Sequence, residues 1–132
     1  MKDTFNREID YLRISVTDRC NLRCLYCMPD GILKKSHDEI MRDEEIIDIV
    51  TEAALLGITK VRITGGEPLV RKGIYDLIKK IKSVKGINEI TITTNGILLI
   101  DNVTLLKEAG VNRVNFSLDT LDSEKYKYIT NS

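Results

Sequence analysis

The sequence predicts an α/β fold made of four consecutive strand–helix units that form part of an open, parallel β/α barrel. Short β-branched segments alternate with longer segments of helical periodicity, and a polar or glycine-containing turn follows each strand segment. Helical connections of this length favour parallel pairing with right-handed crossovers. The predicted strands are Tyr11–Thr17, Lys60–Thr64, Glu89–Thr94 and Arg113–Leu118.

Helix-period segments separate these strands, and a further helix start follows the last one. The first segment, Asp43–Leu56, opens with acidic residues and stops before a glycine. Asp101 is the predicted N-cap of the third segment, which ends at Ala109, and Asp122 opens the fourth. The second segment has one apolar face, formed by Ile74, Leu77, Ile78, Ile81 and Val84.

Alternation within the strands predicts one polar, concave face. Successive strand residues point to opposite faces, and the apolar set must face the helices. The opposite face then carries Arg13, Ser15, Thr17, Arg62, Thr64, Thr91, Thr93, Asn95, Arg113, Asn115 and Ser117. A closed eightfold barrel has an apolar interior and a doubly wound sheet is apolar on both faces, so a partial, TIM-like barrel around a polar ligand fits better. An antiparallel sheet with one wet face is the alternative.

Two arginines on adjacent predicted strands point into this concave face. A buried guanidinium is costly unless it meets an anion, so Arg13 and Arg62 predict a phosphate-bearing ligand. For Arg113, a capping or surface role is as good an interpretation as a ligand contact.

All three cysteines lie in one stretch, DRCNLRCLYCMP, directly after the first strand. Cys20, Cys24 and Cys27 have the spacing C-x3-C-x2-C. The odd count argues against a disulfide framework. A zinc site would need a fourth ligand, for which His37 is the single histidine, whereas an iron–sulfur cubane would be left with one iron lacking a protein ligand. The residues favour a cluster, with zinc and unliganded thiols as open alternatives.

Length and composition limit the function classes. A chain of 132 residues is long enough for one domain at most. Because four strand–helix units make half of an eightfold barrel, we expect part of a larger domain. The 20 basic and 20 acidic residues give no indication of a nucleic acid or membrane partner. Unpaired thiols and a charged N-terminus without an apolar leader predict a cytoplasmic location.

A glycine pair follows the second strand, on the rim that the cysteine loop also occupies. The stretch TGGEP at residues 64–68 offers backbone N–H groups and close approach to a ligand. An open iron needs a chelating ligand, and an amino acid offers an amine and a carboxylate. C-x3-C-x2-C followed by GGEP resembles the radical S-adenosylmethionine superfamily. The strings EIDYLRISVTDRCNLRCLYCMPDG, VRITGGEPLVR, ITTNGILL and GVNRVNFSLDTLD resemble, within it, the family that cyclises GTP in molybdenum cofactor biosynthesis.

This resemblance extends over residues 3–132 and implies a set of site residues. The positions that match ligands of a [4Fe-4S] cluster are Cys20, Cys24 and Cys27. Those that match contacts to S-adenosylmethionine are Tyr26, Gly66 and Ser117. Those that match contacts to GTP are Arg13, Arg62 and Thr93. Asn6 stands where the family usually has glycine, and we expect little change because asparagine tolerates left-handed backbone.

The resemblance also implies a reaction and its partners. The family is a lyase that forms (8S)-3',8-cyclo-7,8-dihydroguanosine 5'-triphosphate from GTP, using S-adenosylmethionine and an electron donor; a homodimer is compatible with it. A second [4Fe-4S] cluster on later cysteines is expected only in the full-length protein, so residues 1–132 are expected to be an N-terminal portion of the radical core that is incomplete for turnover. The alternatives are a peptide-modifying maturase of the same superfamily and a cluster-binding fragment without activity.

Overall fold

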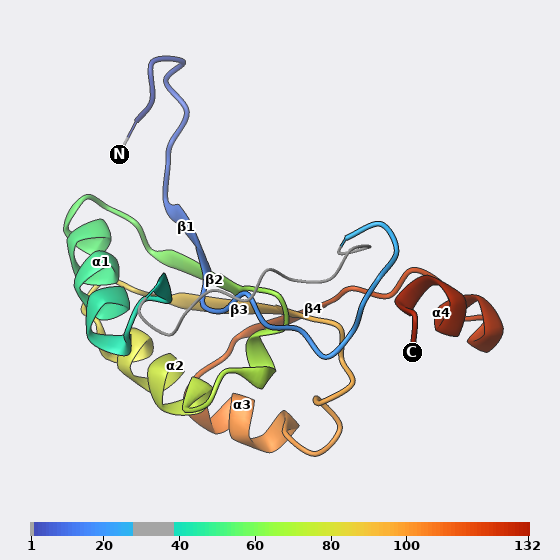
Figure 1. Cartoon of the computed structure of the whole chain (residues 1–132). Helices are drawn as coiled ribbons and strands as arrows, with labels where there is room; N and C mark the ends of the chain where they lie inside the picture. The colour runs from blue at the N-terminus through green and yellow to red at the C-terminus, as the bar shows by residue number, and fades with distance from the viewer. Residues whose placement is uncertain (1, 28–38) are drawn as a thin grey trace.

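The strands form a single parallel sheet. A computed structural model describes residues 2–27 and 39–132; the zinc alternative at His37 lies outside the described residues. The strands are β1 (Tyr11–Ser15), β2 (Lys60–Thr64), β3 (Glu89–Thr94) and β4 (Arg113–Phe116). They pair in parallel in the order β1-β2-β3-β4, which confirms the predicted open α/β sheet (Figure 1). The antiparallel alternative is therefore wrong.

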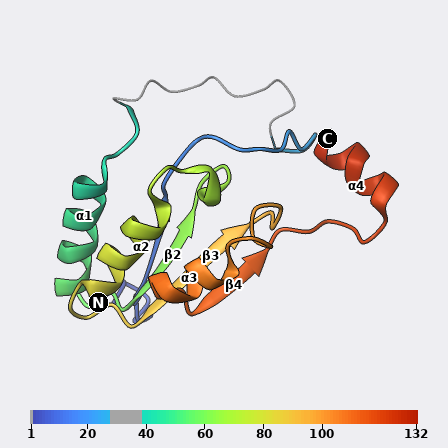
Figure 2. The ribbon, with the colours of Figure 1, turned by 90° about the horizontal axis from the view of Figure 1, so that it is seen from below.

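Helices cover one face of this sheet. The elements between and after the strands are α1 (Asp43–Leu55), the short 3-10 helix η2 (Pro68–Val70), α2 (Ile74–Ser83), α3 (Val103–Ala109) and α4 (Ser123–Thr130). Helices α1, α2 and α3 lie on the same side, and no described helix covers the other side (Figures 1 and 2). Helix α4 lies beyond the carboxyl end of β4. None of the helices in the described ranges is long and apolar enough to cross a membrane.

The alternation of the strands is confirmed by the core. Ile63 of β2 and Ile90 and Ile92 of β3 are fully buried. They share one cluster with the apolar face of α2, whose buried members are Ile74, Leu77, Ile78 and Ile81. The apolar side of β4 differs, because Phe116 is 61% exposed. Helix α4 does not fold back over the sheet as α2 and α3 do, so the end of β4 stays uncovered on its apolar side.

Four element ends differ from the prediction, and one of them is the end of α1, which stops at Leu55, one residue before the predicted Leu56. β1 stops at Ser15 because its neighbour β2 ends at Thr64, and beyond that point only isolated backbone hydrogen bonds continue the pairing. β4 likewise stops at Phe116. The prediction of Asp101 as the N-cap of α3 was wrong: Asn102 occupies that position, and its side chain donates backwards to the Leu98 carbonyl.

The N-cap predicted for the fourth helix is confirmed. An Asp122 carboxylate oxygen accepts the backbone N–H groups of Glu124 and Lys125, each at 3.0 Å. Asn6 takes a φ of 63°, the left-handed conformation expected for it.

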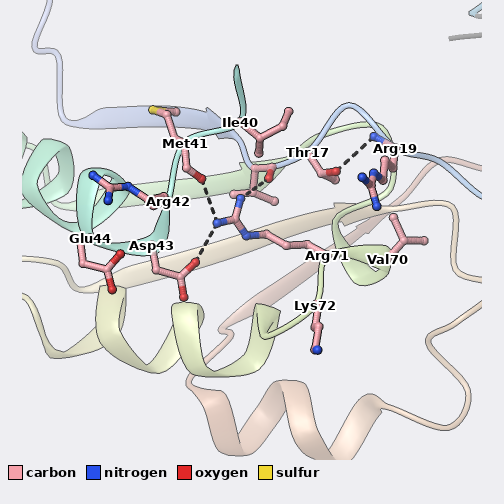
Figure 3. A pocket seen from close by; sticks show the side chains of 11 residues that line it. Thr17, Arg19, Ile40, Met41, Arg42, Asp43, Glu44, Val70, Arg71 and Lys72 are labelled. Carbon is pink, nitrogen blue, oxygen red and sulfur yellow. Dashed lines mark hydrogen bonds and ion pairs between the residues drawn. The ribbon is translucent and has the colours of Figure 1, made fainter. Parts of the chain in front are cut away.

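One partly buried arginine ties the end of β1 to the start of α1. A cavity of about 400 Å³ lies between these elements and the residues after η2 (Figure 3). At its wall the Arg71 guanidinium donates to the carbonyls of Val16 and Met41 and forms an ion pair with Asp43 at 2.7 Å. The Arg71 side chain is only 13% exposed. It therefore fixes the backbone that leads from β1 into the cysteine loop.

We expect Arg71→Ala to lower the free energy of unfolding by about 2–4 kcal/mol, because two carbonyls lose a donor and the Asp43 carboxylate loses its shorter ion pair in a partly dry site. Lys72→Ala is the matched control, since Lys72 is the exposed neighbouring cation, and it should change stability by less than about 0.5 kcal/mol. Urea unfolding of both variants measures the difference. Equal losses would contradict the structural role given to Arg71.

Candidate functional site

A row of cationic side chains crosses the helix-free face of the sheet. The strand register places Arg13 opposite Arg62, Arg62 opposite Thr91, and Thr91 opposite Arg113. The predicted adjacency of Arg13 and Arg62 is thus confirmed. Three guanidinium groups from four neighbouring strands share one level of this face.

These arginines differ in how many of their guanidinium donors have hydrogen-bond or ion-pair partners within the protein. Arg13 is exposed, and its Nε donates to Thr64 Oγ1 across a long 3.4 Å contact. Arg62 is half-buried; its guanidinium carbon lies 5.4 Å from the centroid of the Tyr11 ring, and its enclosed Nε has no hydrogen-bond partner among the described residues. Arg113 pairs with Glu89 at 3.6 Å on the surface. Arg13 and Arg62 are therefore the cations with capacity left for an anionic ligand.

A layer of hydroxyl and amide groups follows the cationic row along the strands. Ser15 lies opposite Thr64, and half-buried Thr93 lies opposite Asn115. Ser117 comes after the end of β4, and its backbone N–H donates to the Thr94 carbonyl at 2.9 Å. Four strand residues span about 13 Å, so the face runs over roughly that length from cations to the carboxyl-end rim.

The cysteine loop lies at that rim and is held by the last helix. The backbone N–H of Arg23 donates to the Thr130 carbonyl at 3.1 Å, and that of Leu25 donates to the Ile129 carbonyl at 2.9 Å. Figure 2 shows the C-terminus beside this segment. These two hydrogen bonds to the end of α4 hold the cysteine loop in place.

The middle thiol of the loop, Cys24, is affected by burial and by its neighbours. Burial raises the pKa of the Cys24 thiol, and the neighbouring Cys20, Asp119 and Cys27 raise it further. The Tyr26 hydroxyl donates to Asp119 Oδ2 at 2.9 Å, and this hydrogen bond raises the pKa of Tyr26 to about 12. The surroundings of Cys24 thus disfavour its bare thiolate, which a bound metal centre would offset.

The donor set of the cysteine loop fits an iron–sulfur cluster, because thiolates are the usual protein ligands of such clusters. Within residues 2–27 and 39–132, no three His, Cys, Asp or Glu side chains converge tightly enough to hold one metal ion. Each thiolate of a cubane binds a different iron, so these side chains need not converge on one ion. Cys20 and Cys24 are half-buried and Cys27 is exposed, so the loop can receive a group from its open side.

The glycine pair after β2 packs against the backbone that enters the cysteine loop. The Gly66 N–H donates to the Thr17 carbonyl at 2.7 Å, and the Glu67 N–H donates to the Arg19 carbonyl at 2.8 Å. A Cβ on Gly66 would lie 2.3 Å from Arg19 O, and one on Gly65 would lie 2.7 Å from Thr17 O. Glycine was expected here to allow a ligand to approach closely. The structure shows that it allows the close approach of the backbone at residues 17–19 of the same chain.

The carboxylate of Glu67 points into the protein. It is 1% exposed, and its Oε1 accepts from the Leu69 N–H at 3.0 Å and the Thr94 hydroxyl at 2.8 Å, while Oε2 accepts from the Asn95 N–H at 2.8 Å. It caps η2 and joins the ends of β2 and β3. Sequence reasoning missed this role, although an acidic residue directly before Pro68 is a helix-start signal.

We expect Glu67→Gln to lower the free energy of unfolding by about 1–3 kcal/mol, because an amide NH2 must face at least one of the donors that the carboxylate now accepts. Glu52→Gln, on the exposed side of α1, is the matched control and should cost less than about 0.5 kcal/mol. Urea titration of the two variants measures this. Indistinguishable curves would contradict the anchoring role.

Comparison with known proteins gives the class to which this site belongs. The Radical SAM superfamily pattern matches residues 14–132, and the chain belongs to that superfamily. It is 58% identical over 131 residues to a GTP 3',8-cyclase from Pelotomaculum thermopropionicum, covering 98% of this chain and 40% of that protein. It is 59% identical over 131 residues to a GTP 3',8-cyclase from Alkaliphilus oremlandii, covering 98% and 41%. The chain therefore spans about 40% of the length of these relatives.

Solved structures with the same fold include SuiB from Streptococcus suis. The form bound to the precursor peptide SuiA superimposes with a TM-score of 0.74 at 27% identity, over 91% of this chain and 26% of SuiB. The form bound to S-adenosylmethionine gives a TM-score of 0.72 at 27% identity, over 92% and 26%.

Proposed function

We propose that residues 1–132 are the N-terminal portion of the radical core of a cytoplasmic GTP 3',8-cyclase, which forms the cyclised nucleotide of molybdenum cofactor biosynthesis. The observation that carries the proposal is the cationic pair Arg13 and Arg62. The pair lies on the polar face of the sheet, within β1 and β2, before the carboxyl ends of the strands where the cysteine loop begins. Identities of 58% and 59% to proteins named GTP 3',8-cyclase support the choice of substrate.

The cysteine loop is the proposed cofactor end of the site. Cys20, Cys24 and Cys27 would hold a [4Fe-4S] cluster, which supplies the electron that cleaves S-adenosylmethionine. Gly66 and Ser117, with Tyr26 in the loop, are the proposed neighbours of S-adenosylmethionine. The S-adenosylmethionine complex of SuiB supports this use of the fold.

The cationic end would bind the phosphates. Arg13 and Arg62 offer several donors to an anion, and the Arg62 Nε has no protein acceptor among the described residues. Thr93 lies between this level and the rim, and its hydroxyl would contact the nucleoside. The polarity of the face thus orients a nucleotide with its phosphates away from the cysteines and its sugar toward them.

A peptide substrate is the second candidate, because SuiB with its precursor peptide has the same fold. Arg13 and Arg62, on adjacent strands of the polar face, favour a phosphate-bearing ligand over a neutral peptide. A nucleotide-binding assay separates the two candidates. A chain that loads the cluster but shows no turnover would be the inactive fragment.

We expect anaerobic reconstitution to load about one cubane per 132-residue chain and Cys24→Ala to abolish it, because two thiolates do not hold a cubane in this loop. Lys72→Ala, on a different surface, is the control and should load normally. Iron analysis and electron paramagnetic resonance measure both. Stoichiometric zinc without a cluster signal, or full loading of Cys24→Ala, would contradict the ligand set.

We expect Arg13→Ala and Arg62→Ala each to weaken GTP binding about ten- to a hundredfold without loss of the cluster, because each removes a charge-assisted phosphate contact. The measurement is equilibrium binding of GTP to the reconstituted full-length protein. Arg113→Ala is the matched control: it removes an arginine from the same row, but one that is already paired with Glu89, so its effect should be smaller. Equal affinities in all three variants would contradict the proposed phosphate site.

A further inference from the structure

The end of β3 reaches across to the first cysteine through one asparagine. The Asn95 amide nitrogen Nδ2 donates to Asn21 Oδ1 at 2.8 Å and lies 4.0 Å from Cys20 Sγ. The other end of the amide, Oδ1, accepts the backbone N–H of Ile97 at 3.1 Å. Since the Ile97 contact requires an acceptor, the orientation of the amide is fixed with its NH2 group toward the sulfur.

The Cys20 sulfur receives donors from two directions. The Leu22 backbone N–H donates to it at 3.4 Å from within the loop, and Asn95 approaches it from the segment that follows β3. A 4.0 Å contact is weak for a neutral thiol. A thiolate is a stronger acceptor of the same N–H groups, since charge-assisted hydrogen bonds are shorter and about twice as strong.

Asn95 is itself anchored. Its backbone N–H donates at 2.8 Å to the carboxylate of Glu67, which is buried and also accepts the Thr94 hydroxyl. The donor that faces Cys20 is therefore held by the ends of both β2 and β3. Such supporting contacts fix metal-ligand orientation and are needed for tight binding.

We propose that Asn95 is a positioning residue that holds Cys20 for the cluster and stabilises the negative charge on its sulfur. This inference rests on the proposed function only in taking Cys20 as a cluster ligand. N–H groups directed at a ligand sulfur stabilise the reduced, more negative cluster and so raise its reduction potential. Asn95 would thus act on the cofactor through Cys20, without contacting substrate.

The test is Asn95→Asp in the reconstituted full-length protein. Aspartate keeps the acceptor for Ile97 but replaces the donor near Cys20 with a carboxylate oxygen. We expect the midpoint potential of the cluster, followed by electron paramagnetic resonance, to fall, and loss of the cluster to a chelator to be about tenfold faster.

Asn115→Asp is the matched control for added charge. Asn115 lies on β4 on the same face, opposite Thr93, so its aspartate adds the same charge away from Cys20 and should lower the potential less. Asn21→Ala is the second variant, since it removes the competing acceptor of the Asn95 amide and should leave the potential unchanged or higher.

Equal shifts in Asn95→Asp and Asn115→Asp, or no shift in either, would overturn the inference while leaving the cluster assignment intact. A fall in Asn21→Ala as large as in Asn95→Asp would also overturn it, because Asn95 would then act through the loop alone. A wild-type protein that loads no cluster would overturn this inference and the proposed function together.

Discussion

The buried carboxylate of Glu67 is the interaction on which the carboxyl-end rim depends. The termini of parallel strands leave backbone donors that water or a side chain must satisfy, and here one acidic group satisfies those of Leu69 and Asn95 together. Because these donors belong to the loops after β2 and β3, a single side chain fixes two adjacent loops. A site assembled from strand ends gains its precision from such links between strands.

The close approach of the glycine pair to the cysteine loop follows from the same arrangement. With Glu67 held inward, the backbone of residues 65–67 lies flat against Thr17 and Arg19, where a side chain on Gly66 would collide with the Arg19 carbonyl. Arg71 also fixes the backbone that leads into the cysteine loop, because its guanidinium donates to the Val16 carbonyl. The cysteine loop therefore starts from a backbone that is fixed on two sides before any cofactor binds.

The sheet, its order and its polar face were predictable because they depend on alternation and on the length of the connections, both of which are local patterns. The pairing of Arg13 with Arg62 followed from the same parity. What could not be predicted depends on contacts between distant segments: Asn95 with Cys20, Tyr26 with Asp119, and the end of α4 with the cysteine loop. The Asp101 cap failed for a different, local reason: Asn102 occupies the N-cap position, and its side chain donates to the Leu98 carbonyl of the preceding turn.

The polar face places two like charges at directly opposed positions, at some cost to the stability of the protein alone. Adjacent parallel strands lie about 4.8 Å apart, so like charges at directly opposed positions repel. Arg13 and Arg62 occupy such positions, and the Tyr11 ring and the Thr64 hydroxyl relieve their charge only in part. Stability improves when an anion neutralises the pair, and a ligand that binds only the folded state stabilises it by mass action. The unfavourable placement of these two cations supports the proposed phosphate site, because a merely structural sheet would gain from replacing either one.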